Sequence, residues 1–213
     1  MGVAGLTKAE QTRAAIVDAA LTMAQAIGLE GLTIGTVAEQ AGLSKSGVFS
    51  RVGSREELQV AALKEYERRF AEQVVVPALR EPRGLARLRA VWRRWLDWMI
   101  SGLGRNGCLF ISGAVEYDDR PGVVRDALLA GLGELRKQLA RTVRQAVETG
   151  ELNSDTDPDQ VAFELYAIVL GLHNETRLFR DARAAPRASA AFERLLTDCG
   201  APRANDHRDS GAR

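Results

Sequence analysis

The sequence predicts an all-α protein, with an N-terminal three-helix helix-turn-helix domain followed by a C-terminal helical bundle. Apolar residues recur at helical spacing in each periodic segment, and no segment shows the alternation that is typical of a strand. Residues 33–52 also read as two short helices joined by a glycine turn, which is the layout of a DNA-reading unit. The 213 residues, 46% hydrophobic and 27% charged, are ordinary for a globular chain.

The first short helix has clear start and stop signals. The hydroxyl of Thr33 can cap it, and segment 34–41 carries apolar residues at i, i+3, i+4 and i+7. Gly42 then ends the helix, because glycine adopts the left-handed conformation at little cost. Ser44 is the next N-cap, and the second helix runs from 45 to 52.

The second helix combines small and cationic residues on one side. Between Ser44 and Arg55 there is no acidic residue. Small residues let the backbone approach base edges, and cations neutralise phosphates. The pattern therefore favours a recognition helix, although an ordinary helical hairpin with a solvated basic face has the same local signals.

The flanking segments complete the unit. An amphipathic helix over 12–27 precedes it, and the link 28–32 follows that helix. After the second helix, Ser54 and Glu57 form a capping box at the start of a long helix. We expect a DNA-binding domain over 1–53, a ligand-binding and dimerisation domain over 54–200, and a disordered tail over 201–213.

This order of motifs, with the run LTIGTVAEQAGLSKSGVFSRVGSREEL, resembles the N-terminal domain of TetR-type transcription regulators over roughly residues 10–75. The run GCLFISGAVEYDDRPGVVRDAL (107–128) resembles a segment of one TetR subgroup of unassigned ligand. The resemblance implies a homodimer that binds double-stranded DNA.

The resemblance also implies which residues meet DNA. Thr33 and Lys45 match positions at the DNA backbone or groove, and Arg55 matches a phosphate contact at the start of the fourth helix. With the small and cationic residues of the second helix, the predicted DNA-binding residues are Thr33, Ser44, Lys45, Ser46, Gly47, Phe49, Ser50, Arg51 and Arg55.

The second helix of this unit, which we call the reader helix, departs from the family pattern at three positions. Phe49 replaces a tyrosine whose hydroxyl binds phosphate, Arg51 replaces an aromatic residue or histidine, and Val52 replaces a phenylalanine. The net charge of the chain is only +1, and residues 1–60 hold five cations against six acids. DNA affinity must therefore come from a local patch.

Five further helical segments follow, over 83–101, 108–117, 123–149, 158–179 and after Pro186. Segment 161–172 is apolar on nearly every side, so it must be buried on every side. We expect the last two helices to pair with their copies in a homodimer. A helix threaded through the centre of a monomer is the alternative.

Aromatic residues suggest an effector pocket in the C-terminal domain. Three tryptophans fall in seven residues, and their spacing of three favours core packing for Trp92 and Trp95 over one shared pocket wall. A small apolar or aromatic effector is the expected ligand. The candidate pocket residues are Trp95, Cys108, Phe110, Tyr117, Phe163, Tyr166 and His173.

The sequence thus predicts a regulator, most simply a repressor that an effector releases from a near-palindromic operator. Control by a protein partner without a ligand is one alternative, and a metal-dependent enzyme using Glu116, Asp118 and His173 is another. No nucleophile–base motif, phosphate loop or metal-ligand spacing supports catalysis, a cofactor or a metal. Without a signal peptide or long apolar run, we expect a cytoplasmic protein with no membrane contact.

Overall fold

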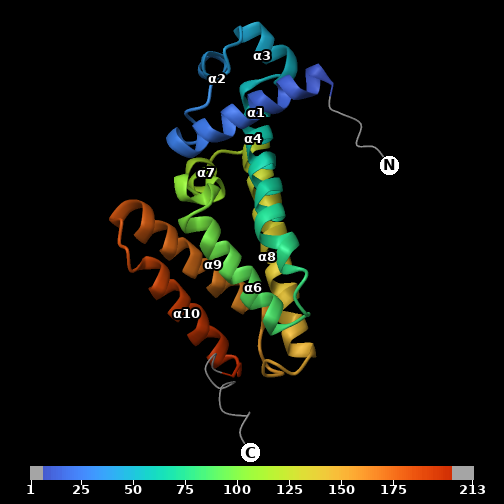
Figure 1. Cartoon of the computed structure of the whole chain (residues 1–213), viewed down its shortest axis with the longest axis vertical. Coiled ribbons are helices and arrows are strands. Elements are labelled where there is room, and N and C mark those ends of the chain that lie inside the picture. The colour runs from blue at the N-terminus through green and yellow to red at the C-terminus, as the bar shows by residue number, and fades with distance from the viewer. Residues whose placement is uncertain (1–6, 203–213) are drawn as a thin grey trace, which may run out of the picture. The chain divides into compact units, whose positions relative to one another are not determined.

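The computed structural model describes residues 7–202 (Figure 1). These residues form helices and no strand, which confirms the predicted fold class. The chain divides into two compact units. The first contains the described residues up to 71 together with 106–132, and the second contains 72–105 and the described residues from 133 to 202.

The helices follow the predicted order, with short π- or 3-10 helices between some of them. Their bounds are α1 Lys8–Ile27, α2 Ile34–Gln40, α3 Lys45–Val52, α4 Arg55–Phe70, the π-helix η1 Ala71–Val75, α5 Val76–Ala78, α6 Leu85–Ile100, the 3-10 helix η2 Leu103–Asn106, α7 Leu109–Tyr117, α8 Val123–Glu148, α9 Pro158–Asn174, the π-helix η3 Glu175–Phe179 and α10 Ala184–Asp198.

Side-chain caps begin the first four helices. Thr33 and Ser44 cap α2 and α3, and Ser54 forms a capping box with Glu57 at the start of α4, as predicted. The helix predicted from residue 12 begins at Lys8 instead. Thr7 accepts a hydrogen bond from the backbone of Glu10, whose carboxylate binds the backbone N–H of Thr7, and this capping box adds a turn.

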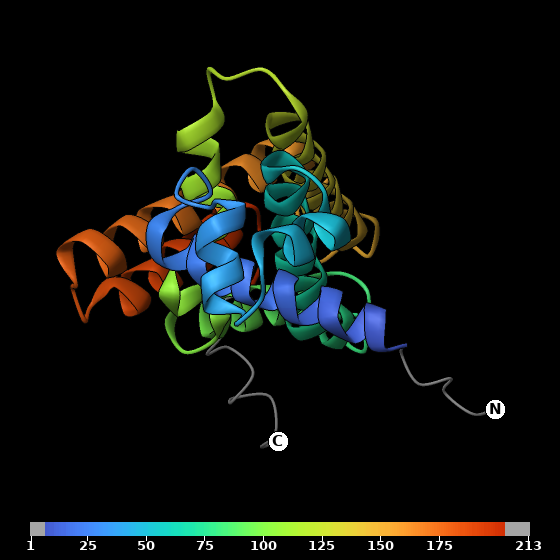
Figure 2. The ribbon, with the colours of Figure 1, turned by 90° about the horizontal axis from the view of Figure 1, so that it is seen from above.

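The core of the first unit lies between α1 and α4, with α2 and α3 packed side by side against α1 (Figures 1 and 2). Because α4 packs along α1, the unit extends past the predicted boundary at residue 53. Its fully buried apolar side chains include Ile16, Leu21, Leu29, Leu32, Val37, Val48, Leu58, Leu63 and Tyr66.

The second unit is built around α6, α9 and α10. Trp92 of α6 stacks on Phe192 of α10, with ring centroids 4.7 Å apart and planes 9° from parallel. Arg89 and Glu193 join the same two helices through an ion pair of 3.0 Å. The predicted core role of Trp92 is therefore confirmed. In Figure 1, α9 and α10 run side by side.

The predicted tail begins too early. Ala201 is 5% exposed, and the carbonyl oxygen of Pro202 accepts a 3.1 Å hydrogen bond from Arg89. These two residues belong to the packed second unit because they continue the turn that ends α10. The rest of the predicted tail, 203–213, lies outside the described residues. Within the described part, no helix is both long and apolar enough to span a bilayer.

Candidate nucleic-acid interface

The turn between α2 and α3 has the predicted geometry. Gly42 has a φ of 65°, in the left-handed region that glycine adopts without strain. The N–H of Leu43, one residue later, donates to the carbonyl of Ala38 at 2.9 Å, which closes the end of α2. This tight connection fixes the direction in which α3 leaves α2.

One face of α3 is buried and the other is open. Val48 is fully buried and Val52 is 7% exposed, so these two side chains hold α3 on the unit. Ser46, Phe49 and Ser50 are exposed on the other side. Phe49 is 59% exposed, and an apolar ring so placed is available to a partner such as a thymine methyl or a sugar.

The hydroxyl groups of α2 and α3 form hydrogen bonds with backbone groups of their own helices. Ser44 Oγ accepts the N–H of Gly47 at 3.1 Å and lies 3.2 Å from Ser46 Oγ, while Ser50 donates to the carbonyl of Gly47 at 3.1 Å. Thr33 Oγ1 accepts the N–H of Thr36 at 3.0 Å. Their second role toward DNA remains a prediction.

The three predicted cations differ in their surroundings. The Lys45 ammonium is exposed and has no partner among the described residues. Arg51 folds back along α3 and donates to the carbonyl of Gly47 at 2.8 Å. Arg55 turns away from α3, because its Nε donates to the carbonyl of Leu32 at 2.8 Å and its Nη2 to that of Glu30. Arg55 is thus engaged within the protein, whereas Lys45 is available to phosphate.

The predicted pocket residues fall in both compact units. Trp95, Cys108 and Tyr117 are buried, Phe110, Tyr166 and His173 are half-buried, and Phe163 is 54% exposed. Phe110 packs edge-on against Tyr66, with ring centroids 5.8 Å apart. Phe163 faces solvent in the single chain, because it lies on the outer side of α9 and not on the side buried within the unit.

Two of these residues titrate in unusual surroundings. Burial raises the pKa of the Cys108 thiol, so the thiol stays protonated and unreactive near neutral pH. Burial, and then the charge of Arg177, lowers the pKa of His173. The Nδ1 atom of His173 is buried without a hydrogen-bond partner among the described residues.

The two acidic residues named in the enzyme alternative accept hydrogen bonds from backbone N–H groups. Glu116 accepts the N–H of Glu30 at 2.7 Å, and Asp118 accepts the N–H of Asp119 at 2.9 Å. Within residues 7–202, no group of three His, Cys, Asp or Glu side chains is placed to hold a metal ion. The geometry therefore gives the enzyme alternative no support.

Sequence reasoning missed Gln59, which is 1% exposed in the core of the first unit. The signal was present, because Gln59 lies at i of an i, i+3, i+4, i+7 set with Ala62, Leu63 and Tyr66 on the buried side of α4. A polar residue in such a set needs a hydrogen-bond partner inside the protein.

The fold and the exposed reader helix define a helix-turn-helix DNA-binding regulator. The family model of the tetracyclin repressor-like C-terminal domain matches residues 84–192, just over half of this 213-residue chain. The chain therefore belongs to the TetR family of transcriptional regulators.

One curated relative is the transcriptional regulator AcuR of Cereibacter sphaeroides, which is 27% identical over 138 residues. The match covers 63% of this chain and 62% of that relative's length. Among solved structures, a TetR-family regulator from Cytophaga hutchinsonii has a TM-score of 0.79 at 18% identity, over 92% of this chain and 98% of its own. AibR in complex with isovaleryl coenzyme A and operator DNA has a TM-score of 0.71 at 20% identity, over 87% and 98%. At these identities the two structures establish the fold.

Proposed function

We propose that this protein is a homodimeric repressor that binds a near-palindromic operator and is released by a small apolar or aromatic effector. The observation that carries the proposal is the outer face of α3. It is exposed and free of acids, and beside it lies an ammonium group, on Lys45, with no partner in the described part of the chain. Such a face suits the major groove and its flanking phosphates.

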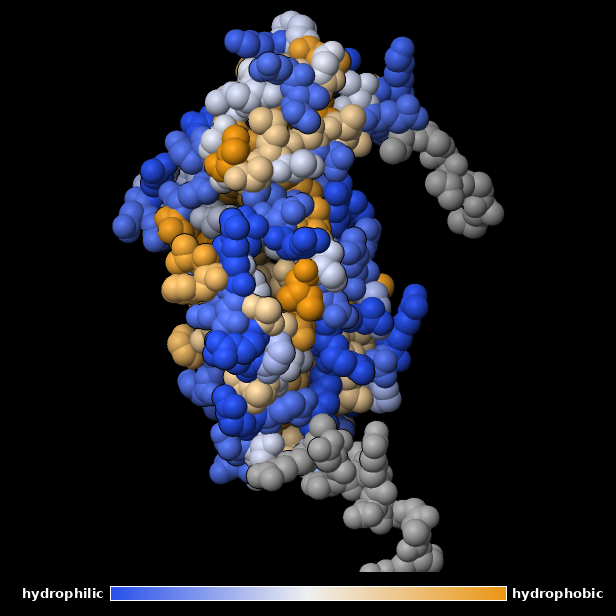
Figure 3. Space-filling view, turned by 60° about the vertical axis from the view of Figure 1, so that its left-hand side comes forward, coloured by the Kyte–Doolittle hydropathy of each residue, from blue (hydrophilic) through white to orange (hydrophobic). Residues whose placement is uncertain are grey.

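The outer side of α9 supports the dimer. Phe163, Ala167, Leu170 and Gly171 are exposed at i, i+4, i+7 and i+8, which places them in one apolar stripe along the helix. Apolar side chains at the surface are visible as orange patches in Figure 3. Two copies paired through α9 and α10 would present two α3 helices to one duplex. Half-sites about 34–36 Å apart, one DNA turn, would then give a near-palindrome.

A charge placed in this stripe tests the dimer. Leu170→Asp should convert the protein to a monomer in sedimentation velocity, because a paired interface would bury the new carboxylate. The matched control is Val115→Asp, at a 73% exposed position on α7. A dimeric Leu170→Asp protein would remove α9 from the interface.

The effector is proposed from two sources of support. The family model covers the C-terminal region that holds the seven candidate pocket residues, and AibR, with the same fold, is in complex with isovaleryl coenzyme A and operator DNA. In the mechanism we propose, an effector bound among these helices displaces α4 and changes the separation of the two readers. When this separation no longer matches successive major grooves, one of the two α3 helices can no longer bind its half-site.

A reporter promoter carrying the operator tests this function. The protein should lower transcription from that promoter, and a small apolar or aromatic compound should restore it and weaken binding of the purified protein to the duplex. Activation of transcription by the DNA-bound protein would reject the repressor assignment. Release that requires a second protein, with no compound effective, would support the partner-controlled alternative.

A further inference from the structure

The link between α1 and α2, residues 28–32, has no regular structure of its own beyond a turn. Its last residue, Leu32, immediately precedes Thr33, the cap of α2. The position of this link therefore sets where the reader pair begins. Side chains from α4 and α7 satisfy much of its polar backbone, and all of them lie in the same compact unit.

Gln59 of α4 joins the link to the end of α7. Its buried Nε2 donates to the carbonyl of Leu29 at 2.7 Å and to the hydroxyl of Tyr117 at 2.9 Å. Both protons of this amide are thereby used inside the core, where an unmet donor is costly.

Tyr117, the last residue of α7, continues the chain of hydrogen bonds. Its hydroxyl donates to Glu30 Oε2 at 2.9 Å. This bond, and then Arg55, lowers the pKa of Glu30. Burial, and then Glu30, raises the pKa of Tyr117, so the hydroxyl keeps its proton as a donor. Arg120 adds an ion pair to Glu30 Oε2 at 3.1 Å.

The backbone of the link is also approached closely by α7. The N–H of Glu30 donates to Glu116 at 2.7 Å. Gly28 has a φ of 81°, and a Cβ there would collide with the Glu116 carboxylate. At Gly113 a Cβ would lie 2.7 Å from a methyl group of Leu29. A side chain at Gly28 or Gly113 would therefore displace Glu116 or Leu29 from its present position.

Arg55, at the first position of α4, binds the link at two carbonyls, those of Leu32 and Glu30. It also pairs with Glu30 Oε1 at 3.2 Å. The start of α4, the link and the end of α7 are thus tied by one connected set of bonds. We call this set, formed by Glu30, Arg55, Gln59, Glu116 and Tyr117, the link clamp.

We propose that the link clamp positions the reader for DNA, and that Arg55 acts as a positioning residue within it and not as a phosphate contact. Tyr117 and Glu116 lie within the region matched by the C-terminal family model, so the clamp is also the point where that region holds the link into α2. Hydrogen bonds weaken steeply when the angle at the donor hydrogen falls below about 120°. A movement of α7 that bends the bonds from Glu116 and Tyr117 would therefore loosen its hold on the link. This inference rests on the proposed operator binding.

Tyr117→Phe tests the clamp with the smallest change, because it keeps the ring and removes only the hydroxyl. Operator affinity of the full-length protein, measured by fluorescence anisotropy, should fall about tenfold, the factor that one hydrogen bond supports. Backbone hydrogen exchange over 28–36 should become faster, with exchange in the middle of α1 unchanged. Wild-type affinity together with wild-type exchange would overturn the proposal.

A conservative pair at Glu30 keeps the test decisive if Tyr117→Phe folds poorly. Glu30→Gln retains an acceptor for the Tyr117 hydroxyl and should bind the operator within about threefold of wild type. Glu30→Ala loses the acceptor and should weaken binding about tenfold, since it removes the same hydrogen bond. Equal affinities for the two variants would contradict the clamp.

Arg55→Gln separates positioning from phosphate contact. A lost phosphate contact lowers the slope of log affinity against log salt by about 0.9. A positioning residue weakens binding and leaves this slope unchanged. A slope reduced by about 0.9 per protomer would return Arg55 to the DNA contacts and overturn its assignment.

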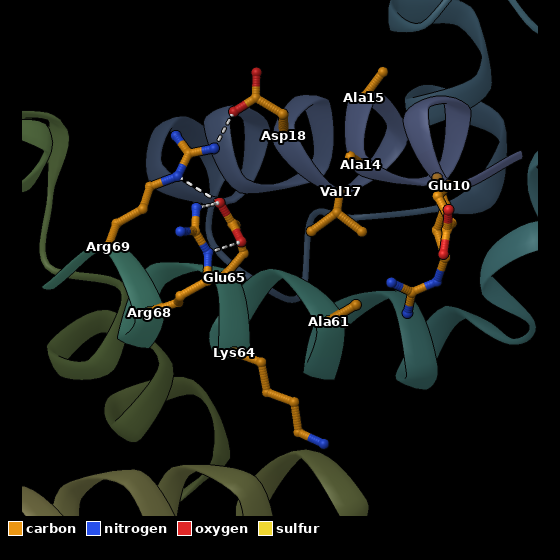
Figure 4. Close-up of a pocket in the computed structure, with 11 residues that line it drawn as sticks. Glu10, Ala14, Ala15, Val17, Asp18, Ala61, Lys64, Glu65, Arg68 and Arg69 are labelled. Atoms are coloured by element: carbon orange, nitrogen blue, oxygen red, sulfur yellow. Dashed lines mark hydrogen bonds and ion pairs between the residues drawn. The ribbon is translucent and has the colours of Figure 1, made fainter. Parts of the chain in front are cut away.

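The matched control is Asp18→Asn. Asp18 joins α1 to α4 through Arg69 at 2.6 Å, beside the Glu65 pairs with Arg68 and Arg69 (Figure 4), with no contribution from the link. Operator affinity should stay within about twofold of wild type, as is usual for an exposed ion pair. If wild-type protein bound no duplex at all, the proposed function itself would fail. Bound wild type with unaffected clamp variants would reject the clamp alone.

Discussion

Lys45 of α3 lies directly over Gly35 of α2. A Cβ on Gly35 would be 3.1 Å from Lys45 Cε and 3.5 Å from Nζ. The missing side chain at Gly35 lets the lysine stem lie flat between the two helices, with its ammonium at the surface. The pair shows how α2 and α3 together present one cation beside the recognition face.

Lys45→Ala should weaken binding to every duplex and lower the salt slope by about 0.9 for each lost phosphate contact. The reason is that this ammonium has no partner within the described chain and is free to displace counterions. Lys137→Ala, which removes the same charge from an exposed site on α8, is the control and should keep the slope. An unchanged slope for Lys45→Ala would remove Lys45 from the interface.

Gly42→Val should destabilise the protein by about 2 kcal/mol or more, because a β-branched residue resists the left-handed conformation found at φ 65°. No neighbouring atom lies within 4 Å of the Cβ position, so the cost comes from the backbone alone. Gly42→Asn should cost less, since asparagine tolerates this region. Urea unfolding followed by circular dichroism measures both, and equal stabilities would contradict the turn geometry.

Gly133→Ala should stabilise the protein, the opposite of the effect expected for Gly42→Val. Gly133 lies inside α8, and nothing lies within 4 Å of its Cβ position. Alanine in a helix interior is favoured over glycine by about 0.5–1 kcal/mol. The melting temperature should therefore rise, and a lower value in a scanning calorimeter would show that this site in α8 has less space or a different conformation.

Glu65 should make stability depend on pH. Its hydrogen bond with Arg68, and then that with Arg69, lowers its pKa to about 2. A carboxyl whose pKa is lower in the folded state stabilises the protein above its unfolded pKa, near 4.5, and loses this contribution as the pH falls toward about 2. Glu65→Gln should flatten the loss of unfolding free energy between pH 5 and about pH 3. Parallel pH profiles for the two proteins would show that the ion pairs do not form in solution.

Local sequence signals are sufficient to predict the helix-turn-helix unit. They are insufficient to predict the contacts that hold this unit in place. The caps at Thr33, Ser44 and Ser54 and the glycine at 42 act within a few residues, so the sequence showed them directly. The capping box of Thr7 is equally local, but it lies before the apolar pattern that predicts the first helix, which begins only at residue 12.

The link clamp was not predictable from neighbouring residues. Gln59 finds its partners 30 and 58 residues away, and Arg55 binds carbonyl groups that any residue carries. A family pattern assigned Arg55 to phosphate, and an aromatic count assigned Tyr117 to a pocket. Only the three-dimensional packing brings the two into one set of bonds.

Selection of bound duplexes from a random DNA library, at about 0.15 M salt, tests the central claim most directly, because weak non-specific binding is largely suppressed there. We predict an enriched near-palindrome with half-site centres about 10 base pairs apart or a multiple of one turn. A folded, effector-free dimer that enriches no site would contradict the proposal that this face of α3 reads an operator.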